Sequence, residues 1–414
     1  MKILFLTDNF PPEVNAPATR TYEHCKEWVK KGHDITVITC NPNFPHGKVY
    51  KGYKNRLYKT EYVDEIKVIR VWSYMTENKG FFKRIIDYMS YAFSAFFVGL
   101  FQKTDIVIAT SPQFFTTWTG WGLSKVKRKP WIFELRDIWP ESLKTVGSMK
   151  PGSILKILEK IELGLYNDAK QVIAVTEAFK KNLIGRGIDG DKISVITNGS
   201  NNELFNSRVK DEKLLEKLKL QNKFVVGYIG THGMAHSLDF IIKAIAKVND
   251  SDIHFLFIGD GAIKSDIITL SDSLKLTNIT FLDSIAKEEV PLYLSICDIS
   301  LAPLKNRKNF REVIPSKIFE ASAMGKPTLL GVQGEAQEII EKYKAGICFI
   351  PENENDFLSK LKEIKEKKKY LECQKGCVQL AKSYDRKNLA EEMLLIINKM
   401  AKKNYVQKKE SIKV

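Results

Sequence analysis

Residues 224–233, FVVGYIGTHG, decide the fold class of this chain. The first six residues are apolar on both faces, and glycines follow them directly. Such a run is typical of a buried parallel strand, because a half-exposed strand would alternate apolar and polar residues. Together with the helical stretches between the runs, the pattern predicts an α/β fold with two doubly wound parallel sheets. Similar runs recur at residues 3–6, 35–39, 68–72, 106–110, 131–135, 172–175, 193–196, 255–258, 279–282, 299–302, 328–330 and 347–350.

The length of the chain favours two domains with a cleft between them, because 414 residues are more than one ordinary core can use. A polar stretch, NGSNNE at residues 198–203, separates the two series of strands and has the composition of a loop. We therefore predict an N-terminal Rossmann-like domain at residues 1–203 and a second one at residues 204–383. Residues 384–414 are predicted to form a helix that packs back towards the first domain and ends in a frayed tail.

The composition excludes several classes of protein. Apolar residues make up 44% of the chain and charged residues 28%, which is typical of a globular protein. The formal net charge of +16 is spread over both halves, and the chain has no nucleic-acid-binding motif, so we expect no nucleic-acid partner. The six cysteines include no C-x-x-C pair. The first residues have the pattern of a strand rather than a signal peptide, so we expect a cytoplasmic protein with reduced thiols.

The most apolar segment of the chain is residues 85–101, whose length is at the short end of the range for a membrane-spanning helix. The segment contains Asp87 and follows the sequence FFKR at residues 81–84. A transmembrane helix is not expected, because Asp87 would lie in the bilayer. Two interpretations stay open: a helix that belongs to the body of the first domain, and an interfacial helix that contacts a membrane surface.

Two glycine loops follow neighbouring strands of the second domain. Gly230 and Gly233 come after the strand at residues 224–229, and Gly259 and Gly261 come after the next strand. Ligands of open α/β sheets bind at the carboxyl ends of the strands, and glycine lets the backbone approach a phosphate. The spacing is not the dinucleotide-binding fingerprint, in which one residue separates the first two glycines. The loops favour a diphosphate ligand, and the alternative is a pair of tight turns without a ligand.

A charged loop and a short helix follow at residues 311–327, REVIPSKIFEASAMGKP. Ser316 is predicted to cap a helix that ends before Pro327. A carboxylate such as Glu320 can accept hydrogen bonds from adjacent sugar hydroxyls, and an ammonium such as Lys317 can neutralise a phosphate. The alternative is an exposed Lys–Glu pair on a capped helix, which does not account for the glycine loops upstream.

The spacing of two glutamates carries a resemblance to a known family. Glu312, seven residues and Glu320, followed by A-x-A-x-G-x-P, resemble the E-x7-E signature of retaining glycosyltransferases of family 4. That family has the GT-B fold, in which two Rossmann-like domains face a cleft, and the similarity covers essentially the whole chain. The segments FPPEVNAPATR at residues 10–20, ELRDIWPES at residues 134–142 and GTHGMAH at residues 230–236 resemble the WbuB-like subgroup, which acts in O-antigen and capsule synthesis.

The resemblance implies roles for residues of the second domain. Glu320 would bind the ribose hydroxyls of a nucleotide-sugar donor, and Glu312 would hold hydroxyls of the transferred sugar. Lys317 and the first glycine loop would hold the diphosphate, and the base would lie near Phe281 and Leu282. The side chain of Asp260 has an alternative use as a helix cap. The candidate donor-binding residues are Gly230, Thr231, His232, Gly233, His236, Asp260, Phe281, Leu282, Lys317 and Glu320.

The first domain is expected to bind the acceptor. Arg136 and Asp137 follow a predicted strand, and the alternative for Arg136 is a buried ion pair with Asp137 or Glu141. Many relatives have a glycine pair where this chain has Asn15 and Ala16, so we expect this loop to contact the acceptor. The candidate acceptor-binding residues are Asn15, Arg20 and Arg136, and the candidate catalytic residues are Glu312, Lys317, Arg136 and Asp137.

The reaction that the resemblance implies is a retaining transfer of a sugar from a UDP-sugar. Cleavage of a sugar-diphosphate bond builds negative charge on the leaving group, which backbone N–H groups and a lysine can stabilise. We expect no metal and no other cofactor, because no D-x-D motif stands in a plausible loop. Two alternatives stay open: a UDP-sugar 2-epimerase of the same architecture, and a non-catalytic sugar-nucleotide-binding protein.

The subgroup resemblance also suggests the substrates and the location. The transferred sugar would be an N-acetylated 6-deoxyhexosamine such as L-FucNAc. The acceptor would be a polyprenyl-diphosphate-linked saccharide in O-antigen, capsule or lipopolysaccharide synthesis. The basic first domain, with FFKR beside the apolar helix, predicts peripheral attachment to the cytoplasmic face of the inner membrane.

Overall fold

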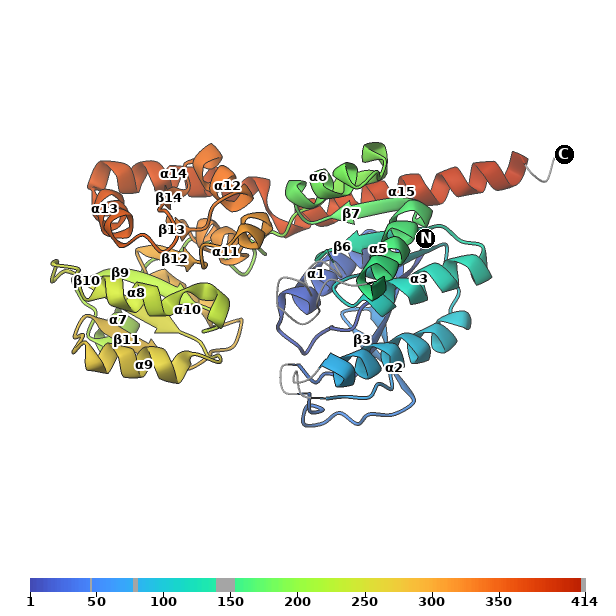
Figure 1. The fold of residues 1–414 in the computed structure, drawn as a ribbon, viewed down its shortest axis with the longest axis horizontal. Helices are drawn as coiled ribbons and strands as arrows, with labels where there is room; N and C mark the ends of the chain where they lie inside the picture. The colour runs from blue at the N-terminus through green and yellow to red at the C-terminus, as the bar shows by residue number, and fades with distance from the viewer. Residues whose placement is uncertain (45–46, 77–80, 139–152, 411–414) are drawn as a thin grey trace. The chain divides into compact units, whose positions relative to one another are not determined.

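The computed structural model of the chain describes residues 1–44, 47–76, 81–138 and 153–410. The chain folds into two units (Figure 1). The first unit is Met1–Thr197 together with Arg386–Val414, and the second unit is Asn198–Asp385. The domain boundaries predicted from the sequence were residues 203 and 383.

A mostly parallel sheet forms the centre of the first unit. Within the described ranges its strands lie in the order β3-β4-β2-β1-β5-β6-β7-β8, and every neighbouring pair except β3 with β4 is parallel. The strands are β1 (Lys2–Leu6), β2 (Asp34–Cys40), β3 (Tyr58–Val63), β4 (Ile66–Val71), β5 (Ile106–Thr110), β6 (Trp131–Leu135), β7 (Gln171–Ala174) and β8 (Ile193–Val195). The helices are α1 (Ala16–Lys30), α2 (Phe81–Leu100), α3 (Phe114–Lys127), α5 (Ser153–Asp168), α6 (Glu177–Gly185), the 3-10 turn η1 (Gly190–Lys192) and α15 (Arg386–Glu410).

Strand β3 is the strand of this sheet that was not predicted from the sequence. Its sequence YKTEYV is largely exposed, and it pairs antiparallel with β4 at the edge of the sheet. Lys59 and Glu61 lie on this strand and form an ion pair at 3.2 Å. Charged side chains are typical of edge strands, because they hinder pairing with another chain. The polar composition that protects the edge is therefore also the reason why the sequence did not predict this strand.

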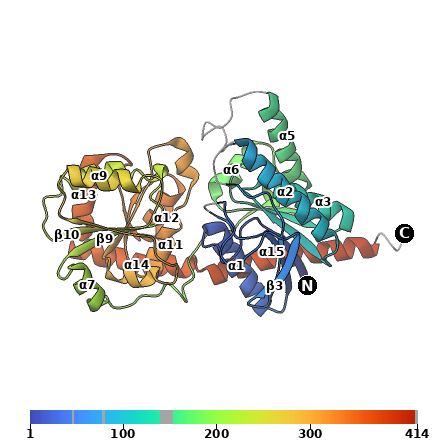
Figure 2. The same cartoon turned by 90° about the horizontal axis from the view of Figure 1, so that it is seen from below.

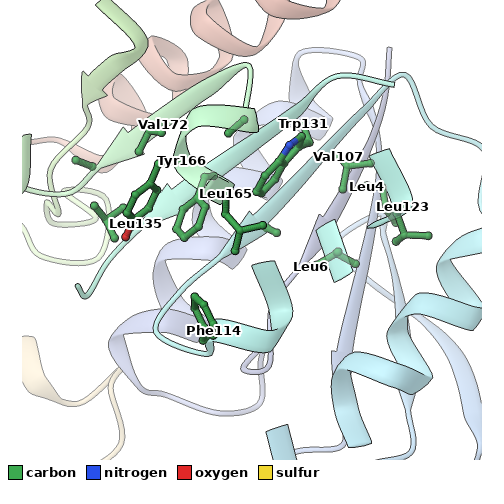
Figure 3. Packing of buried hydrophobic residues seen from close by; sticks show 14 of the residues in the cluster. Leu4, Leu6, Val107, Phe114, Leu123, Trp131, Leu135, Leu165, Tyr166 and Val172 are labelled. Atoms are coloured by element: carbon green, nitrogen blue, oxygen red, sulfur yellow. The ribbon is translucent and has the colours of Figure 1, made fainter. Parts of the chain in front are cut away.

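Helices pack apolar side chains against one face of this sheet (Figure 3). Strands β5 and β6 are buried at every position, as expected for strands that are covered on both faces. Full burial of a large apolar side chain contributes about 1.5–3 kcal/mol, so this cluster supplies much of the stability of the unit. Figure 3 shows Leu4, Leu6, Val107, Phe114, Leu123, Trp131, Leu135, Leu165, Tyr166 and Val172 in this cluster.

The last helix of the chain completes the other face of the same sheet. Helix α15 packs against α1, and the Nε1 atom of Trp28 donates a hydrogen bond to the carbonyl oxygen of Ala390 at 2.8 Å. Met393 and Ile397 of α15 lie in one apolar cluster with Phe5 of β1. The core of the first unit is therefore built from both ends of the chain.

The second unit has a sheet in which every neighbouring pair is parallel. In the described part of the chain the strand order is β11-β10-β9-β12-β13-β14. Figure 2 shows α9 and α13 on one face of this sheet and α7 and α14 on the other. The strands are β9 (Phe224–Ile229), β10 (Ile253–Ile258), β11 (Ile279–Leu282), β12 (Ile299–Pro303), β13 (Thr328–Gly331) and β14 (Gly346–Cys348). The helices are α7 (Glu212–Leu218), η2 (Met234–His236), α8 (Leu238–Ile245), α9 (Lys264–Ser273), α10 (Val290–Ile296), η3 (Lys308–Glu312), α11 (Lys317–Ala323), α12 (Glu335–Tyr343), α13 (Glu354–Lys365) and α14 (Lys367–Ser383).

The strand order reverses at one point in each parallel sheet. In the first unit, β1 lies between β2 and β5, and in the second unit, β9 lies between β10 and β12. Chain segments leave the carboxyl ends of these neighbouring strands towards opposite faces of the sheet. Ligands of open α/β sheets bind in the crevice at such a point. The two reversal points therefore mark where the functional residues are expected.

The apolar helix α2 lies within the first unit and packs against α3. Within the residues that the structure describes, no helix combines the length and the hydropathy that crossing a membrane requires.

A conservative change tests the attachment of α15 to the first unit. Trp28→Phe removes the indole donor from a fully buried position while it keeps an aromatic ring. We expect a loss of about 1–3 kcal/mol in the free energy of unfolding, because a buried acceptor loses its partner. Urea unfolding followed by far-UV circular dichroism measures this change in the free energy of unfolding. The control is Trp121→Phe at a position that is 42% exposed, and equal effects of the two changes would show that the buried hydrogen bond contributes nothing.

Candidate active site

Two glycine loops meet at the carboxyl ends of β9 and β10. Gly230 has φ +147° and Gly259 has φ +148°, values that side chains disfavour. A Cβ atom at Gly259 would lie 1.9 Å from the carbonyl oxygen of Gly230, so the two backbones are in contact. The backbone N–H of His232 donates to the carbonyl oxygen of Asp260 at 2.8 Å. The two loops therefore form one connected backbone surface beside the point where the strand order reverses.

The ammonium of Lys317 lies against the first glycine loop. Its Nζ atom is 3.7 Å from the centroid of the Tyr228 ring and would be 3.2 Å from a Cβ atom at Gly230. Nζ is buried and has no hydrogen-bond partner among the described residues. Burial lowers the pKa of Lys317 to about 7, although the nearby Glu320 carboxylate opposes this shift. A buried ammonium without a hydrogen-bonding partner is costly, so an anion at this position would stabilise the site.

Two histidines of the same segment are held in the neutral form. Burial lowers the pKa of His232 to about 4, and the charges of Lys264 and Lys317 add to the effect. Burial and Lys317 likewise lower the pKa of His236 to about 4. Both ring nitrogens of His232 are buried, and neither has a hydrogen-bond partner in the part of the chain that the structure describes. A neutral imidazole donates one hydrogen bond and accepts another, so these rings are suited to polar ligand groups.

The remaining residues of the glycine loops have local structural contacts. Thr231 is exposed, and its carbonyl oxygen accepts a hydrogen bond from the Tyr228 hydroxyl at 2.6 Å. Gly233 directly precedes η2. The carboxylate of Asp260 accepts a hydrogen bond from the backbone N–H of Gly261 at 2.8 Å. Asp260 therefore stabilises its own turn rather than capping a helix, because α9 begins only at Lys264.

The predicted position of the base lies at the end of β11. Phe281 and Leu282 are half-buried, and the Phe281 ring is 5.5 Å from the ring of Phe257. The carbonyl oxygen of Leu282 accepts hydrogen bonds from the backbone N–H of Gly259 at 3.3 Å and from Lys264 Nζ at 3.2 Å. The strand end is thus joined directly to the second glycine loop.

Glu320 lies one helical turn beyond Lys317 on α11. Its side chain is 14% exposed, and its carboxylate forms an ion pair with the ammonium of Lys287. Ser316 precedes α11 as predicted, but its side chain makes no capping hydrogen bond. The reason is that Ser316 already has helical dihedral angles, whereas a capping side chain requires an extended backbone. The predicted N-cap position of Ser316 is therefore confirmed, but its side chain does not cap the helix.

Glu312 is the last residue of η3 and is half-buried. The loop that carries it is held by its neighbours. A Cβ atom at Gly334 would lie 2.2 Å from the carbonyl oxygen of Arg311, so the backbone before α12 touches η3. Earlier in the loop, the backbone N–H of Lys305 donates to the carbonyl oxygen of Ala235 at 2.9 Å. The role of Glu312 towards the transferred sugar stays a prediction.

The other candidate residues lie in the first unit. Arg136 follows β6, and its backbone N–H donates to the Ser111 hydroxyl at 2.8 Å. The Nη1 atom of Arg136 is buried without a hydrogen-bond partner within the described ranges. Burial lowers the pKa of Arg136 to about 10, although the Glu134 carboxylate favours the charged form. Asp137 is half-buried beside the same serine. Glu141, an alternative partner that the sequence suggested, lies outside the described residues together with the rest of residues 139–142.

Arg20 is not available to an acceptor. Its Nε atom forms an ion pair with Glu134 at 2.9 Å, and both side chains are 1% exposed. Its Nη2 atom donates to the carbonyl oxygen of Ile196 at 2.9 Å. The guanidinium thus links α1 to β6 and to the segment after β8. This burial contradicts the predicted acceptor-binding role, because the side chain offers almost no surface to a ligand.

Asn15 is the N-cap of α1. Its Oδ1 atom accepts a hydrogen bond from the backbone N–H of Ala18 at 2.9 Å, and its Nδ2 atom donates to Asn9 at 2.5 Å. Such a cap typically contributes about 1 kcal/mol to helix stability. Its acceptor-binding role stays a prediction.

Three further residues belong to these sites and were missed in the sequence. Asp8 follows β1 at the reversal point of the first sheet, and burial raises its pKa. It also interacts electrostatically with Arg136. Lys264 and Lys287 lie near the predicted base and the Glu320 carboxylate, respectively. The position of Asp8 directly after a buried strand was a usable signal, whereas nothing in the local sequence around Lys287 indicated its partner.

The depressed pKa of Lys317 predicts how stability depends on pH. The pKa is about 7 in the folded chain and about 10.4 in an unfolded chain, so the unfolded state binds more protons between these pH values. Stability should therefore rise with pH across this window. Lys317→Met should raise the free energy of unfolding at pH 7 by at least about 1 kcal/mol and should lose this advantage as the pH approaches 10. Urea unfolding of both proteins at pH 7, 8.5 and 10 measures this difference in the free energy of unfolding. A variant that is less stable than the parent at pH 7 would contradict the burial of an uncompensated charge.

Two family models together match nearly the whole chain. The model described as "Glycosyltransferase Family 4" matches residues 17–204, and the one described as "Glycosyl transferases group 1" matches residues 210–400. The reversal point of the second unit, with both glycine loops, lies within the second match, whereas β1 and the loop after it precede the first match.

Curated relatives and solved structures agree with the family models. The putative colanic acid biosynthesis glycosyl transferase WcaI of Escherichia coli strain K12 is 24% identical over 366 residues, which are 85% of this chain and 89% of that protein. The structure of Anabaena HepE in complex with UDP and glucose has a TM-score of 0.71 at 18% identity and covers 96% of this chain and 100% of its own. Sucrose-phosphate synthase from Thermosynechococcus elongatus has a TM-score of 0.77 at 14% identity, with coverages of 96% and 98%. These likenesses confirm the predicted GT-B fold, and with both units matched by the family models, this chain belongs to the glycosyltransferases of family 4.

Proposed function

We propose that this glycosyltransferase moves a sugar from a UDP-sugar to a lipid-linked saccharide during synthesis of a surface polysaccharide, by a retaining mechanism without a metal. One observation carries the donor half of this proposal. The buried ammonium of Lys317 lies on the glycine loops without a hydrogen-bond partner among the described residues, one turn before the Glu320 carboxylate. A cation for a diphosphate and a carboxylate for a vicinal diol match the two ends of a ribonucleoside diphosphate.

The residues of the second unit fit the needs of the leaving group. Negative charge grows on the diphosphate as the bond to the anomeric carbon breaks, and preorganised donors at that point lower the barrier. The Lys317 ammonium and a neutral His232 ring are such donors, because both are buried before a ligand arrives. The acceptor oxygen then forms the new bond to the anomeric carbon on the same face. Its proton passes to a diphosphate oxygen, so UDP leaves with the proton.

Relatives support the choice of donor and pathway. UDP is bound in the HepE structure, and UDP-glucose is bound in a second structure of the same protein. Two curated relatives, WcaI and the Bacillus subtilis protein TuaH, are named for colanic acid and teichuronic acid biosynthesis. Both products are polymers, so an acceptor that already carries sugar is the simplest proposal. The transferred sugar that we propose, an N-acetylated 6-deoxyhexosamine such as L-FucNAc, rests on the subgroup resemblance alone.

The first unit provides an acceptor site at its reversal point. Arg136 follows β6 and Asp8 follows β1, and partial burial lowers the pKa of Arg136 and raises the pKa of Asp8. The unsatisfied Nη1 atom of Arg136 can donate to an acceptor phosphate or hydroxyl. A carboxyl beside it can accept from a hydroxyl, so the pair suits a polar saccharide.

An exposed apolar surface on α2 supports attachment to a membrane. Phe93, on α2, is 67% exposed, and Phe101, directly after the end of α2, is 83% exposed. Exposed basic residues lie at both ends of α2, and large apolar patches rimmed by charge are typical of membrane or protein contacts. We therefore propose that the face binds the headgroup region of an anionic bilayer. The exposed apolar residues along α2 are Ile86, Met89, Phe93, Phe97 and, directly after the helix, Phe101, and the basic residues at its ends are Lys83, Arg84 and Lys103.

Two substitutions separate the donor site from the acceptor site. Glu320→Ala should weaken UDP binding at least about 10-fold, because hydrogen bonds to a charged group are among the strong ones. Arg136→Ala should leave UDP binding unchanged and lower the rate of transfer. Calorimetry with UDP measures the first effect, and UDP release from UDP-sugars with a lipid-diphosphate saccharide measures the second. A new sugar nucleotide formed without an acceptor would instead identify an epimerase, and unchanged UDP affinity in Glu320→Ala would refute the site.

The exposed face of α2 predicts binding to anionic vesicles. The double variant Phe93→Ser and Phe97→Ser should lose most of its flotation with liposomes that contain phosphatidylglycerol, because two exposed apolar side chains no longer enter the interface. Raising the salt concentration should weaken binding of the parent protein. Matched changes at exposed apolar positions elsewhere, Val378→Ser and Leu395→Ser, are the control. Equal flotation of all variants would argue against this face.

A further inference from the structure

Lys287 is a charged residue of the second unit that has no role in the proposed reaction. It lies in the segment between β11 and α10. Its ammonium forms an ion pair with Oε1 of Glu320 and lies 4.8 Å from the centroid of the Phe205 ring. Both contacts come from other segments of the unit, so three distant parts of the sequence meet at this ammonium.

The surroundings of Lys287 fix its position. Phe205 is 1% exposed and belongs to the apolar cluster that also contains Met324. The Lys287 and Glu320 side chains are 25% and 14% exposed. A cation over an aromatic face is attracted by the ring, and the attraction grows as water is removed. The ring therefore holds the ammonium on one side while the carboxylate binds it on the other.

This arrangement leaves Glu320 able to bind a ligand. A carboxylate has two oxygens and about four positions for accepting hydrogen bonds. The Lys287 ammonium occupies one of these positions, so a vicinal pair of hydroxyls can use the others. Because a glutamate side chain has several rotamers, a partner that fixes one of them removes an entropic cost from binding.

We infer that Lys287 is a positioning residue that orients Glu320 and thereby makes the enzyme select ribonucleotides over deoxyribonucleotides. The inference rests on the proposed function, in which Glu320 binds the ribose. Lys287 acts through Glu320 and does not contact the nucleotide. Its contact with the Phe205 ring distinguishes it from Lys317, whose ammonium has no hydrogen-bond partner in the described part of the chain and lies on the glycine loop.

Calorimetric titration with UDP and with 2′,3′-dideoxy-UDP tests the inference. The parent enzyme should bind UDP at least about 10-fold more tightly than the dideoxy analogue, because the analogue cannot donate to Glu320. Lys287→Met keeps most of the side-chain volume and removes the charge, and it should reduce this preference to about 3-fold or less. Affinity for the dideoxy analogue should change little, and Lys287→Arg should recover part of the preference.

Two further proteins make the result specific. The control Lys247→Met removes an ammonium from another Lys–Glu pair of the unit, with Glu354 at 2.6 Å, in which the lysine is 61% exposed. It should leave both affinities unchanged. In a Glu320→Gln background, Lys287→Met should have no further effect on the preference, because the two residues act as one unit. Thermal unfolding of each variant reports on folding independently of ligand binding.

The outcomes separate the inference from the proposed function. If the parent protein binds neither nucleotide, the proposed donor is wrong, and the inferred role of Lys287 is refuted as well. If the parent prefers UDP and Lys287→Met keeps that preference, the donor site stands and the role of Lys287 is refuted. An equal loss of affinity for both nucleotides in Lys287→Met would show instead that Lys287 contacts the diphosphate, and this too would overturn the inference.

Discussion

The contact between the backbones of Gly230 and Gly259 sets the geometry of the donor site. A side chain at Gly259 would collide with the carbonyl oxygen of Gly230, so the loops after β9 and β10 are in direct backbone contact. This approach holds the loop from Gly230 to Gly233 in place and turns His232 into the interior. It also leaves room beside Gly230 for the long side chain of Lys317, which arrives from α11. A single larger residue in either loop would therefore disturb the backbone, the imidazole and the ammonium together.

Much of the fold could be predicted, because it depends on a pattern that is local in sequence. Buried parallel strands are mostly apolar, and β5 and β6 are confirmed to be buried at every position. The edge strand β3 was not predicted, because an exposed edge carries polar residues. The local pattern located the N-cap at Ser316 correctly, but it did not show that the backbone there has helical angles, which prevent a capping hydrogen bond.

The candidate site could be predicted only in part, for a physical reason. The glycine loops, Lys317 and Glu320 lie within short segments whose spacing carries the information. The partner of Glu320 is Lys287, and the partner of Arg20 is Glu134, which lies far away in the sequence. Pairing of this kind is decided by how strands and helices are arranged, which no single segment specifies. For Arg20, that arrangement replaces a predicted ligand contact with a buried ion pair that holds the first unit together.

The course of α15 has a consequence for how the protein is made. Helix α15 is synthesised after the second unit, yet Trp28, Met393 and Ile397 place it in the core of the first unit. The second unit, by contrast, consists of one continuous segment, Asn198–Asp385. During synthesis, the face of the first sheet that α1 and α15 share is only partly covered until the second unit has been made, although domains otherwise fold in the order in which they emerge. Termination of synthesis before α15 would therefore damage the half of the protein that was translated first.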